Sequence, residues 1–235
     1  MEPVLWFGWF RADIIAEYAE LFWRGLQTTI VITIIGIVQG TALGLLVGLA
    51  RLARAQHAPA RQLCRFLLRW PASVYVSFFR GTPLFVQILL IHFAVMPVFI
   101  NPDGGLLIDG DAARTLKQDY GALLSGVVAL TLNAGAYISE VFRAGIQSID
   151  AGQAEAARSL GLSSSQAMRH VVLPQAFRRM LPPLGNNAIA LLKDSSLVSA
   201  IGLSELAYAA RTVAGAYSRY WEPYLTISVM YWVLT

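Results

Sequence analysis

The stretch of sequence that decides the fold is residues 153–184, QAEAARSLGLSSSQAMRHVVLPQAFRRMLPPL, a polar segment between very apolar neighbours. Good helix formers start at Glu155 and run into Gly161. Glycine accepts the left-handed backbone conformation that commonly ends a helix, because it has no Cβ atom. The pattern therefore predicts a helix that ends in a tight turn at Gly161.

A second helix is predicted immediately after this turn. Ser163 and Gln166 have the spacing of a capping box, in which each side chain satisfies a free backbone N–H at the start of a helix. Pro174 disfavours helical geometry at the residue before it, so the second helix should end near Val172. The resulting helix–turn–helix has too little apolar surface to form a domain. It either packs against a partner or is a solvated loop that happens to be helical.

The composition indicates a protein with several membrane spans. Of its 235 residues, 56% are hydrophobic and only 14% are charged, whereas a soluble domain carries about 25% charged residues. The net charge of +4 does not indicate nucleic acid, because the basic residues collect in two loops between apolar stretches, which is a signal of membrane topology. The single cysteine excludes an intrachain disulfide.

The chain is predicted to be one all-α transmembrane domain, residues 1–235, with five spans. An aromatic segment at about 1–23 precedes them, either as an interfacial helix or as a short lead-in to the first span. The fifth span has roughly 15 residues, fewer than the ~20 that a spanning helix needs, so this span is expected to be truncated at Thr235. The spans are expected at about 26–49, 71–99, 121–142, 183–203 and 221–235, with a long polar loop at about 150–182.

The distribution of arginine predicts the orientation of the chain. Residues 51–69 contain five arginines and no acidic residue, so by the positive-inside rule this loop is cytoplasmic and the N-terminus is outside. Arg143 and the basic residues of the loop at 150–182 agree with this orientation. The loop at 100–120 is more acidic than basic, and we expect a solvated loop on the outside. The alternative is that it folds over the mouth of the path or contacts an external partner.

The second span is too long for one straight helix. Thirty helical residues from Trp70 to Phe99 would cover about 45 Å, against a hydrocarbon core of ~30 Å. Pro83 lacks the N–H that a helical hydrogen bond requires. A bend or offset is therefore predicted near Gly81 and Pro83.

The first span carries a row of glycines at every fourth position. Small residues at this spacing share one helical face and let two helix backbones approach closely in a membrane. The alternative is that glycine is simply more common in membrane helices. We predict a packing face formed by Gly36, Gly40, Gly44 and Gly48.

Polar and ionisable groups within the spans are candidates for a substrate pathway, because such groups are costly in a membrane. Asn133, Tyr137 and Glu140 fall on one face of the third span. A site for a zwitterionic amino acid needs donors and acceptors together, and the polar residues of the spans supply both. The candidates are Arg80, Asn133, Tyr137, Glu140, Lys193, Asp194 and Ser195.

These residues also have a structural interpretation. Pairs such as Lys193 with Glu140, or Asp194 with Arg80, would merely hold the bundle together, and Arg80 alone can extend toward the cytoplasmic side. His92 is expected to be a packed or hydrogen-bonded core histidine. No two histidines have metal-ligand spacing, and no serine has the His/Asp partners of a nucleophile.

The polar stretch resembles the EAA loop of ABC importer permeases, whose pattern is E-A-A, three residues, G, nine residues, I-x-L-P. Residues 155–157, Gly161 and 171–174 match it, with Val171 in place of the usual isoleucine. Three further stretches resemble the polar amino acid uptake branch of that family, which includes histidine/glutamine permease-like proteins. They are FRGTP at 79–83, AYISEVFRAGI at 136–146 and KDSSL at 193–197.

The resemblance implies a five-span bundle of the type I permease kind in the bacterial inner (plasma) membrane, part of an importer for a polar amino acid. It implies a second permease copy or homologue, a cytoplasmic ABC ATPase dimer, a periplasmic or extracellular amino-acid-binding protein and membrane lipid as partners. ATP and Mg would be bound by the ATPase, because this chain has no phosphate-binding G-x-x-x-x-G-K-[ST] motif and is not expected to be an enzyme. The hairpin at 155–174 would couple the permease to the ATPase. The coupling residues implied by the resemblance are Glu155, Ala156, Ala157, Gly161, Leu173 and Pro174.

Two other function classes compete with an importer permease, namely an integral-membrane enzyme and a passive channel. An integral-membrane enzyme acting on lipid would need a catalytic cluster near an interface, which the sequence does not display. A passive channel would need neither the hairpin nor an ATPase. The sequence does not specify which amino acid an importer would carry.

Overall fold

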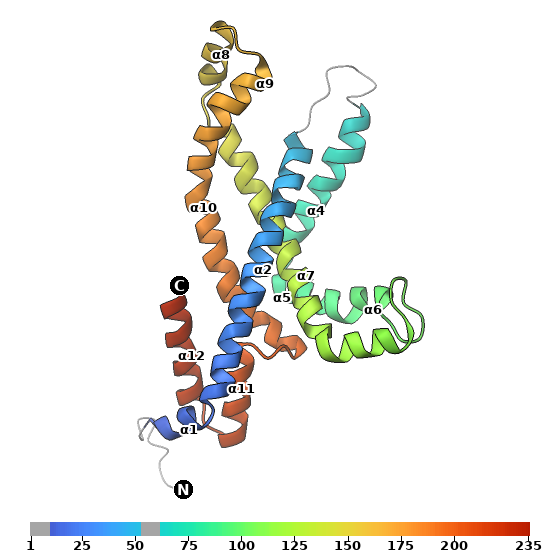
Figure 1. Ribbon diagram of the computed structural model, residues 1–235, viewed down its shortest axis with the longest axis vertical. Coiled ribbons are helices and arrows are strands. Elements are labelled where there is room, and N and C mark those ends of the chain that lie inside the picture. The colour runs from blue at the N-terminus through green and yellow to red at the C-terminus, as the bar shows by residue number, and fades with distance from the viewer. Residues whose placement is uncertain (1–9, 53–61) are drawn as a thin grey trace. The chain divides into compact units, whose positions relative to one another are not determined.

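The computed structural model describes residues 10–52 and 62–235, and within these ranges the chain is almost entirely helical (Figure 1). Its contacts divide it into two compact units, which we name by their place in the sequence. The terminal unit comprises Met1–Ile34, Ile88–Val127 and Leu192–Thr235, and the middle unit comprises Ile35–Gln87 and Val128–Leu191.

Among the described residues, two helices are long and apolar enough to cross a membrane, namely α2 (Ala19–Leu52) and α7 (Gly110–Gln147). A third candidate span is a broken pair, Gln62–Gly81 and Leu84–Phe99, whose halves are bent by 110°. The bend predicted from Pro83 is therefore confirmed. The residue before this proline is extended, as the steric demand of a proline ring requires.

The regions of the predicted fourth and fifth spans contain two further helices, which are not among the candidate spans named above, so the count of five spans stays a prediction. α10 (Leu173–Asp194) continues into the 3-10 helix η4 (Ser195–Ile201), which ends at Gly202 with φ of +86°. α12 (Trp221–Leu234) forms the last helix. α10 thus includes residues that precede the predicted fourth span.

The predicted helix end near Val172 is wrong, because the chain stays helical through Pro174. α9 (Ser164–Ala167) passes into the π-helical turn η3 (Met168–Val172) and then directly into α10. In a regular α-helix, a proline ring clashes with the carbonyl four residues earlier. The wider π turn before Pro174 relieves this contact and lets the helix continue.

Residues 100–120 are only partly the solvated loop that the sequence predicts. α7 begins at Gly110, so the second half of this stretch is helical. The first half forms a turn in which Gly104 has φ of +130° and Ile100 pairs with Ile108 in an isolated bridge. The helix starts early because the residues after Gly110 include alanine and leucine and no proline.

The core of the terminal unit lies around the start of α2, where α1 (Ala12–Glu17), α11 (Leu206–Tyr217) and α12 pack (Figure 1). Ile14 is 1% exposed, so α1 belongs to this core as a short lead-in to α2. The rest of the predicted aromatic lead-in, residues 1–9, lies outside the described residues. The buried core side chains are Ile14, Phe22, Leu206, Ala209, Ala210, Val213 and Ile227.

The remaining elements belong to the broken second span and to the polar stretch. They are η1 (Arg65–Arg69), α4 (Trp70–Gly81), α5 (Leu84–Leu90), η2 (Ile91–Val95), α6 (Met96–Phe99) and α8 (Ala151–Ser159).

Candidate functional site

The polar stretch forms a helical hairpin, α8 and α9, at the end of α7 and α10 in the middle unit (Figure 1). Asp150 caps α8, and its side chain accepts a hydrogen bond from the N–H of Gly152 at 2.6 Å. After α8 the chain turns at Gly161, whose φ of +91° confirms the predicted left-handed turn. The N–H of Gly161 donates to the carbonyl of Arg158 at 2.9 Å, which closes the end of the helix.

The second helix of the hairpin starts with the predicted capping box. The N–H of Gln166 donates to Ser163 Oγ at 3.3 Å, and the N–H of Ser163 donates to Gln166 Oε1 at 2.8 Å. The two helices pack through small residues, since Ala157 and Ala167 are 6% and 1% exposed. The hairpin therefore has a defined shape without a large apolar core.

The outer surface of the hairpin is open to solvent. Of the residues named from the EAA-like pattern, only Ala157 is buried, whereas Glu155, Ala156, Gly161, Leu173 and Pro174 are exposed. Leu160, next to the turn, is 82% exposed. Sequence reasoning did not single out Leu160, although a leucine immediately before a helix-ending glycine in a polar segment was a usable signal.

The four glycines of α2 face α7 and α10 within the middle unit. A Cβ atom built on Gly40 would lie 2.7 Å from the Ala134 Cβ atom, and one built on Gly44 would lie 2.8 Å from Ile138 Cγ2. Gly36 similarly faces Leu191 and Leu130, and Gly48 faces Phe142 and Ser139. The absence of side chains at these positions is what lets the two helix backbones approach.

Asn133 is held in a buried amide network rather than in an open pathway. Its Nδ2 donates to Gln87 Oε1 at 3.0 Å, and Gln87 Nε2 donates to the carbonyl of Phe79 at 2.9 Å. Gln87 is 2% exposed. Sequence reasoning missed Gln87, which stands out only as the one amide in the apolar run of α5.

Glu140 lies at the centre of an arginine cluster near the end of α7. Its side chain is 17% exposed. Oε2 accepts hydrogen bonds from Nε and Nη2 of Arg143 at 2.8 and 2.6 Å, and Oε1 accepts one from Nη1 of Arg51. Arg80 Nη1 lies farther away, at 3.6 Å from Oε1. Both carboxylate oxygens are thus already paired, and their partner Arg51 was not predicted.

Arg80 stands over the ring of Tyr137, with its guanidinium carbon 5.3 Å from the ring centroid. Such a cation–π contact orients the guanidinium group over the ring face. Together with Glu140, these two side chains line a recess of about 430 Å³ in the middle unit. Its other polar walls come from Ser148, Arg179 and Asn187.

The remaining candidates lie in the terminal unit. Lys193 and Asp194 are the last residues of α10, and Ser195 Oγ donates to the carbonyl of Leu192 at 2.7 Å. The structure therefore brings Arg80, Tyr137 and Glu140 together and places Asn133 elsewhere. Within the described ranges, no group of three or more His, Cys, Asp or Glu side chains has the arrangement of a metal site.

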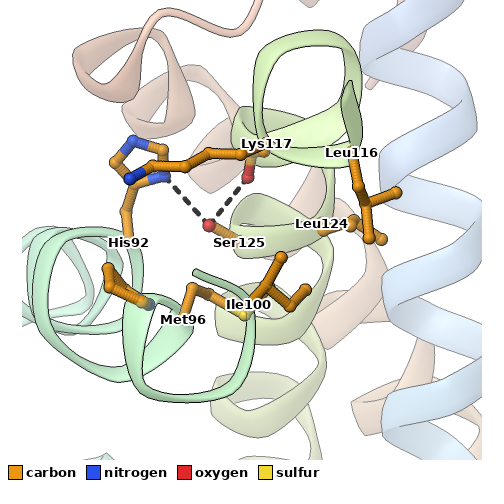
Figure 2. A pocket seen from close by; sticks show the side chains of 9 residues that line it. His92, Met96, Ile100, Leu116, Lys117, Leu124 and Ser125 are labelled. Carbon is orange, nitrogen blue, oxygen red and sulfur yellow. Dashed lines mark hydrogen bonds between the residues drawn. The ribbon is translucent and has the colours of Figure 1, made fainter. Parts of the chain in front are cut away.

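His92 lines a small cavity of about 20 Å³ in the terminal unit, together with Lys117 and Ser125 (Figure 2). Its Nδ1 lies 2.9 Å from Ser125 Oγ, which in turn donates to the carbonyl of Gly121 at 2.8 Å. The predicted hydrogen bond of His92 is confirmed, although the residue is half-buried and not in the core. This cavity has room for about one water molecule.

Residues 60–235 match the family described as binding-protein-dependent transport system inner membrane component. The chain belongs to this family. Its fold is that of a helical membrane bundle of the type I ABC permease kind, as the family and the structural neighbours show. As a member, it is a permease subunit and not itself an enzyme, because ATP hydrolysis belongs to a separate subunit.

Individual relatives of this permease match over most of their length. The probable amino-acid ABC transporter permease protein YckA of Bacillus subtilis (strain 168) is 32% identical over 100% of this chain and 91% of that protein. The glutamine transport system permease protein GlnP of Escherichia coli (strain K12) is 35% identical over 90% of this chain and 85% of that protein. A crystal structure of an amino acid ABC transporter with histidines is 36% identical, with a TM-score of 0.77 over 94% of this chain and 90% of that chain.

Proposed function

We propose that this permease is the transmembrane subunit of an ATP-binding-cassette importer that moves a polar amino acid into the cytoplasm. The observation that carries the proposal is the exposed hairpin of α8 and α9, closed by the left-handed turn at Gly161. The amino acid as cargo is supported by the relatives, among which is a glutamine permease. Of the candidate residues of the spans, Arg80, Tyr137 and Glu140 are grouped at one recess, which the substrate would pass.

The hairpin is the proposed coupling element to the ATPase. Its exposed face offers Glu155 for polar contacts and Leu160 for an apolar contact with a groove of the partner. The helix continues from α9 through η3 into α10 without a break. A displacement of the hairpin would therefore be transmitted into α10 as the motion of a rigid body, and the spans would switch between inward-open and outward-open states.

The proposed assembly has the partners that the sequence predicts. Two permease chains, identical or homologous, would pair in the bacterial inner membrane, with the N-terminus outside and the hairpin in the cytoplasm. An ABC ATPase dimer would bind ATP and Mg on the inner side, and an amino-acid-binding protein would deliver substrate on the outer side. The arginine-rich sequence at 51–69 and the basic residues of the hairpin favour this orientation.

The test is ATP-dependent uptake by proteoliposomes that contain this chain with its ATPase. Vanadate-sensitive uptake of an amino acid is expected, whereas a channel would conduct without ATP and a lipid-modifying enzyme would show no uptake. Glu155→Lys should reduce the yield of ATPase recovered with the permease, and Asp111→Lys, an exposed change in the first turn of α7, should not. Undiminished recovery with Glu155→Lys would contradict the docking role of the hairpin.

A further inference from the structure

We infer that the recess beside Glu140 binds the carboxylate group of the transported amino acid, with Arg80 as its ligand. This inference rests on the proposed function and adds two statements to it. It identifies the part of the substrate that the recess recognises. It also assigns the cargo to neutral polar amino acids rather than to those with a cationic side chain.

Within the described part of the cluster around Glu140, Arg80 is the arginine whose N–H donors remain available to bind a ligand. Arg51 and Arg143 both donate hydrogen bonds to Glu140, whereas Arg80 donates none to any side chain or backbone group in residues 10–52 and 62–235. Its side chain is 43% exposed. A guanidinium group has five N–H donors in a planar fork that matches a carboxylate. Arg80 therefore offers an unoccupied fork on the wall of a recess.

The position of Arg80 is fixed before any ligand arrives. The ring of Tyr137 supports one face of the guanidinium at 5.3 Å, and Glu140 attracts it from 3.6 Å. A side chain that is already held in place loses less conformational freedom on binding, so more of the interaction contributes to affinity. The 3.6 Å separation is long for a charge-assisted hydrogen bond, so a carboxylate ligand need not break one.

Glu140 is unsuited to bind a cationic side chain, although among the described residues it is the one acid that lines the recess. Both of its oxygens already accept hydrogen bonds from arginine. Arg179 of α10 also lines the recess and adds a second arginine side chain to it. A lysine or arginine substrate would bring a further positive charge into this environment, which repels it.

The recess also offers an acceptor for the ammonium group of a zwitterion. Asn187 Nδ2 donates to the carbonyl of Pro183 at 2.9 Å, which fixes the orientation of the amide. Its Oδ1 atom accepts no hydrogen bond from the described part of the chain and lines the recess with Arg80. At about 430 Å³, the recess has room for an amino acid and some water.

The experiment measures amino acid binding to the permease–ATPase complex in nanodiscs by calorimetry, without the external binding protein. Among the twenty L-amino acids, a neutral polar one is expected to bind more tightly than arginine or lysine. Its carboxamide derivative, which lacks the carboxylate, should bind about tenfold to a hundredfold more weakly. Arg80→Gln should weaken binding of the amino acid by the same factor and leave binding of the carboxamide unchanged.

Three controls make the result specific. Arg65→Gln removes an exposed arginine of η1 that does not line the recess, and it should leave affinity unchanged. Arg80→Lys keeps the positive charge but not the planar fork of N–H donors. Its affinity for the amino acid should therefore fall between that of the unaltered protein and that of Arg80→Gln. If Arg80→Gln does not fold, Tyr137→Leu replaces it, because it removes the support of the guanidinium, while Tyr137→Phe keeps the ring and should bind normally.

The inference is overturned if Arg80→Gln binds the amino acid as tightly as the unaltered protein, or if it weakens the carboxamide equally. It is also overturned if Arg80-dependent binding is seen only for phosphatidylglycerol, tested against phosphatidylcholine nanodiscs, since the anion would then be a lipid phosphate. Recovery of the ATPase with Arg80→Gln separates this inference from the proposed function. If Arg80→Gln recovers the ATPase normally and binds the amino acid with unchanged affinity, the assignment of the recess as the carboxylate site is refuted and the proposed importer function is not.

Discussion

Gln87 Oε1 accepts a hydrogen bond from Asn133 Nδ2 at 3.0 Å, and this contact joins the broken second span to α7. Gln87 Nε2 donates to the carbonyls of Phe79 and Thr82 at 2.9 and 3.0 Å, on the other side of the bend. Both amide side chains are buried, at 2% and 7% exposure. The break at Pro83 leaves backbone carbonyls without helical partners, and Gln87 satisfies them.

Asn133→Ala should destabilise the protein by about 1–3 kcal/mol, because it leaves the buried Oε1 atom of Gln87 without a donor. The midpoint of thermal unfolding in detergent measures this effect. Gln118→Ala, which removes an exposed amide from the same helix, is the matched control and should unfold at the original temperature. Equal midpoints for the two variants would show that the amide network does not stabilise the bend.

Gly44→Val should destabilise the contact between α2 and α7 by about 1–3 kcal/mol through overpacking. The added Cβ atom would lie 2.8 Å from Ile138 Cγ2 and 3.0 Å from the carbonyl oxygen of Gly135, so a backbone has to shift. Ala42→Val places the same side chain two residues away on the exposed face of α2. An equal drop in the unfolding midpoint of both variants would show that valine destabilises α2 at either position, and would contradict overpacking at the glycine face.

Local features of the sequence were sufficient for the turn of the hairpin and for the bend. The φ of Gly161 and the capping box of Ser163 depend on a few neighbouring residues, so spacing alone predicts them. Pro83 breaks its helix for a reason that is equally local. Pro174 carries the same signal, yet the helix continues, because a π turn in the preceding residues absorbs the ring.

The contacts of the recess depend on tertiary packing and could not be predicted from spacing. Glu140 was a candidate because it is an acid within a span, but its partner Arg51 lies 89 residues away in the chain. Arg51 was counted only as part of a basic loop. The same limit applies to Gln87, which is an ordinary amide until the bend brings it to Asn133. Residue type identified the participants, and the fold determined which of them meet.

Gly161→Ala should reduce ATP-driven uptake while the spans stay folded. A residue with a Cβ atom pays about 1–2 kcal/mol in the left-handed conformation, so at φ of +91° the turn loses its defined shape. The matched control is Gly185→Ala in α10, where φ is not positive and no atom lies within 4 Å of the added Cβ. Uptake per folded transporter is the measurement. Equal uptake by both variants would contradict the role of this turn in coupling.

Glu140→Gln should lower stability more than removal of an exposed acid, by about 1–3 kcal/mol, because it leaves Arg51 and Arg143 facing each other without the carboxylate that holds them. Glu20→Gln is the control, since Glu20 pairs with Arg24 at a site where both side chains are more than 70% exposed. Such a pair contributes only about 0–1 kcal/mol. Combining Glu140→Gln with Arg51→Gln should lower the free energy of unfolding by less than the sum of the single changes. The double change removes the repulsion between Arg51 and Arg143 together with the attraction of Glu140 for Arg51. Thermal unfolding of the four proteins measures this coupling, and strictly additive effects would show that Glu140 and Arg51 do not act as a pair.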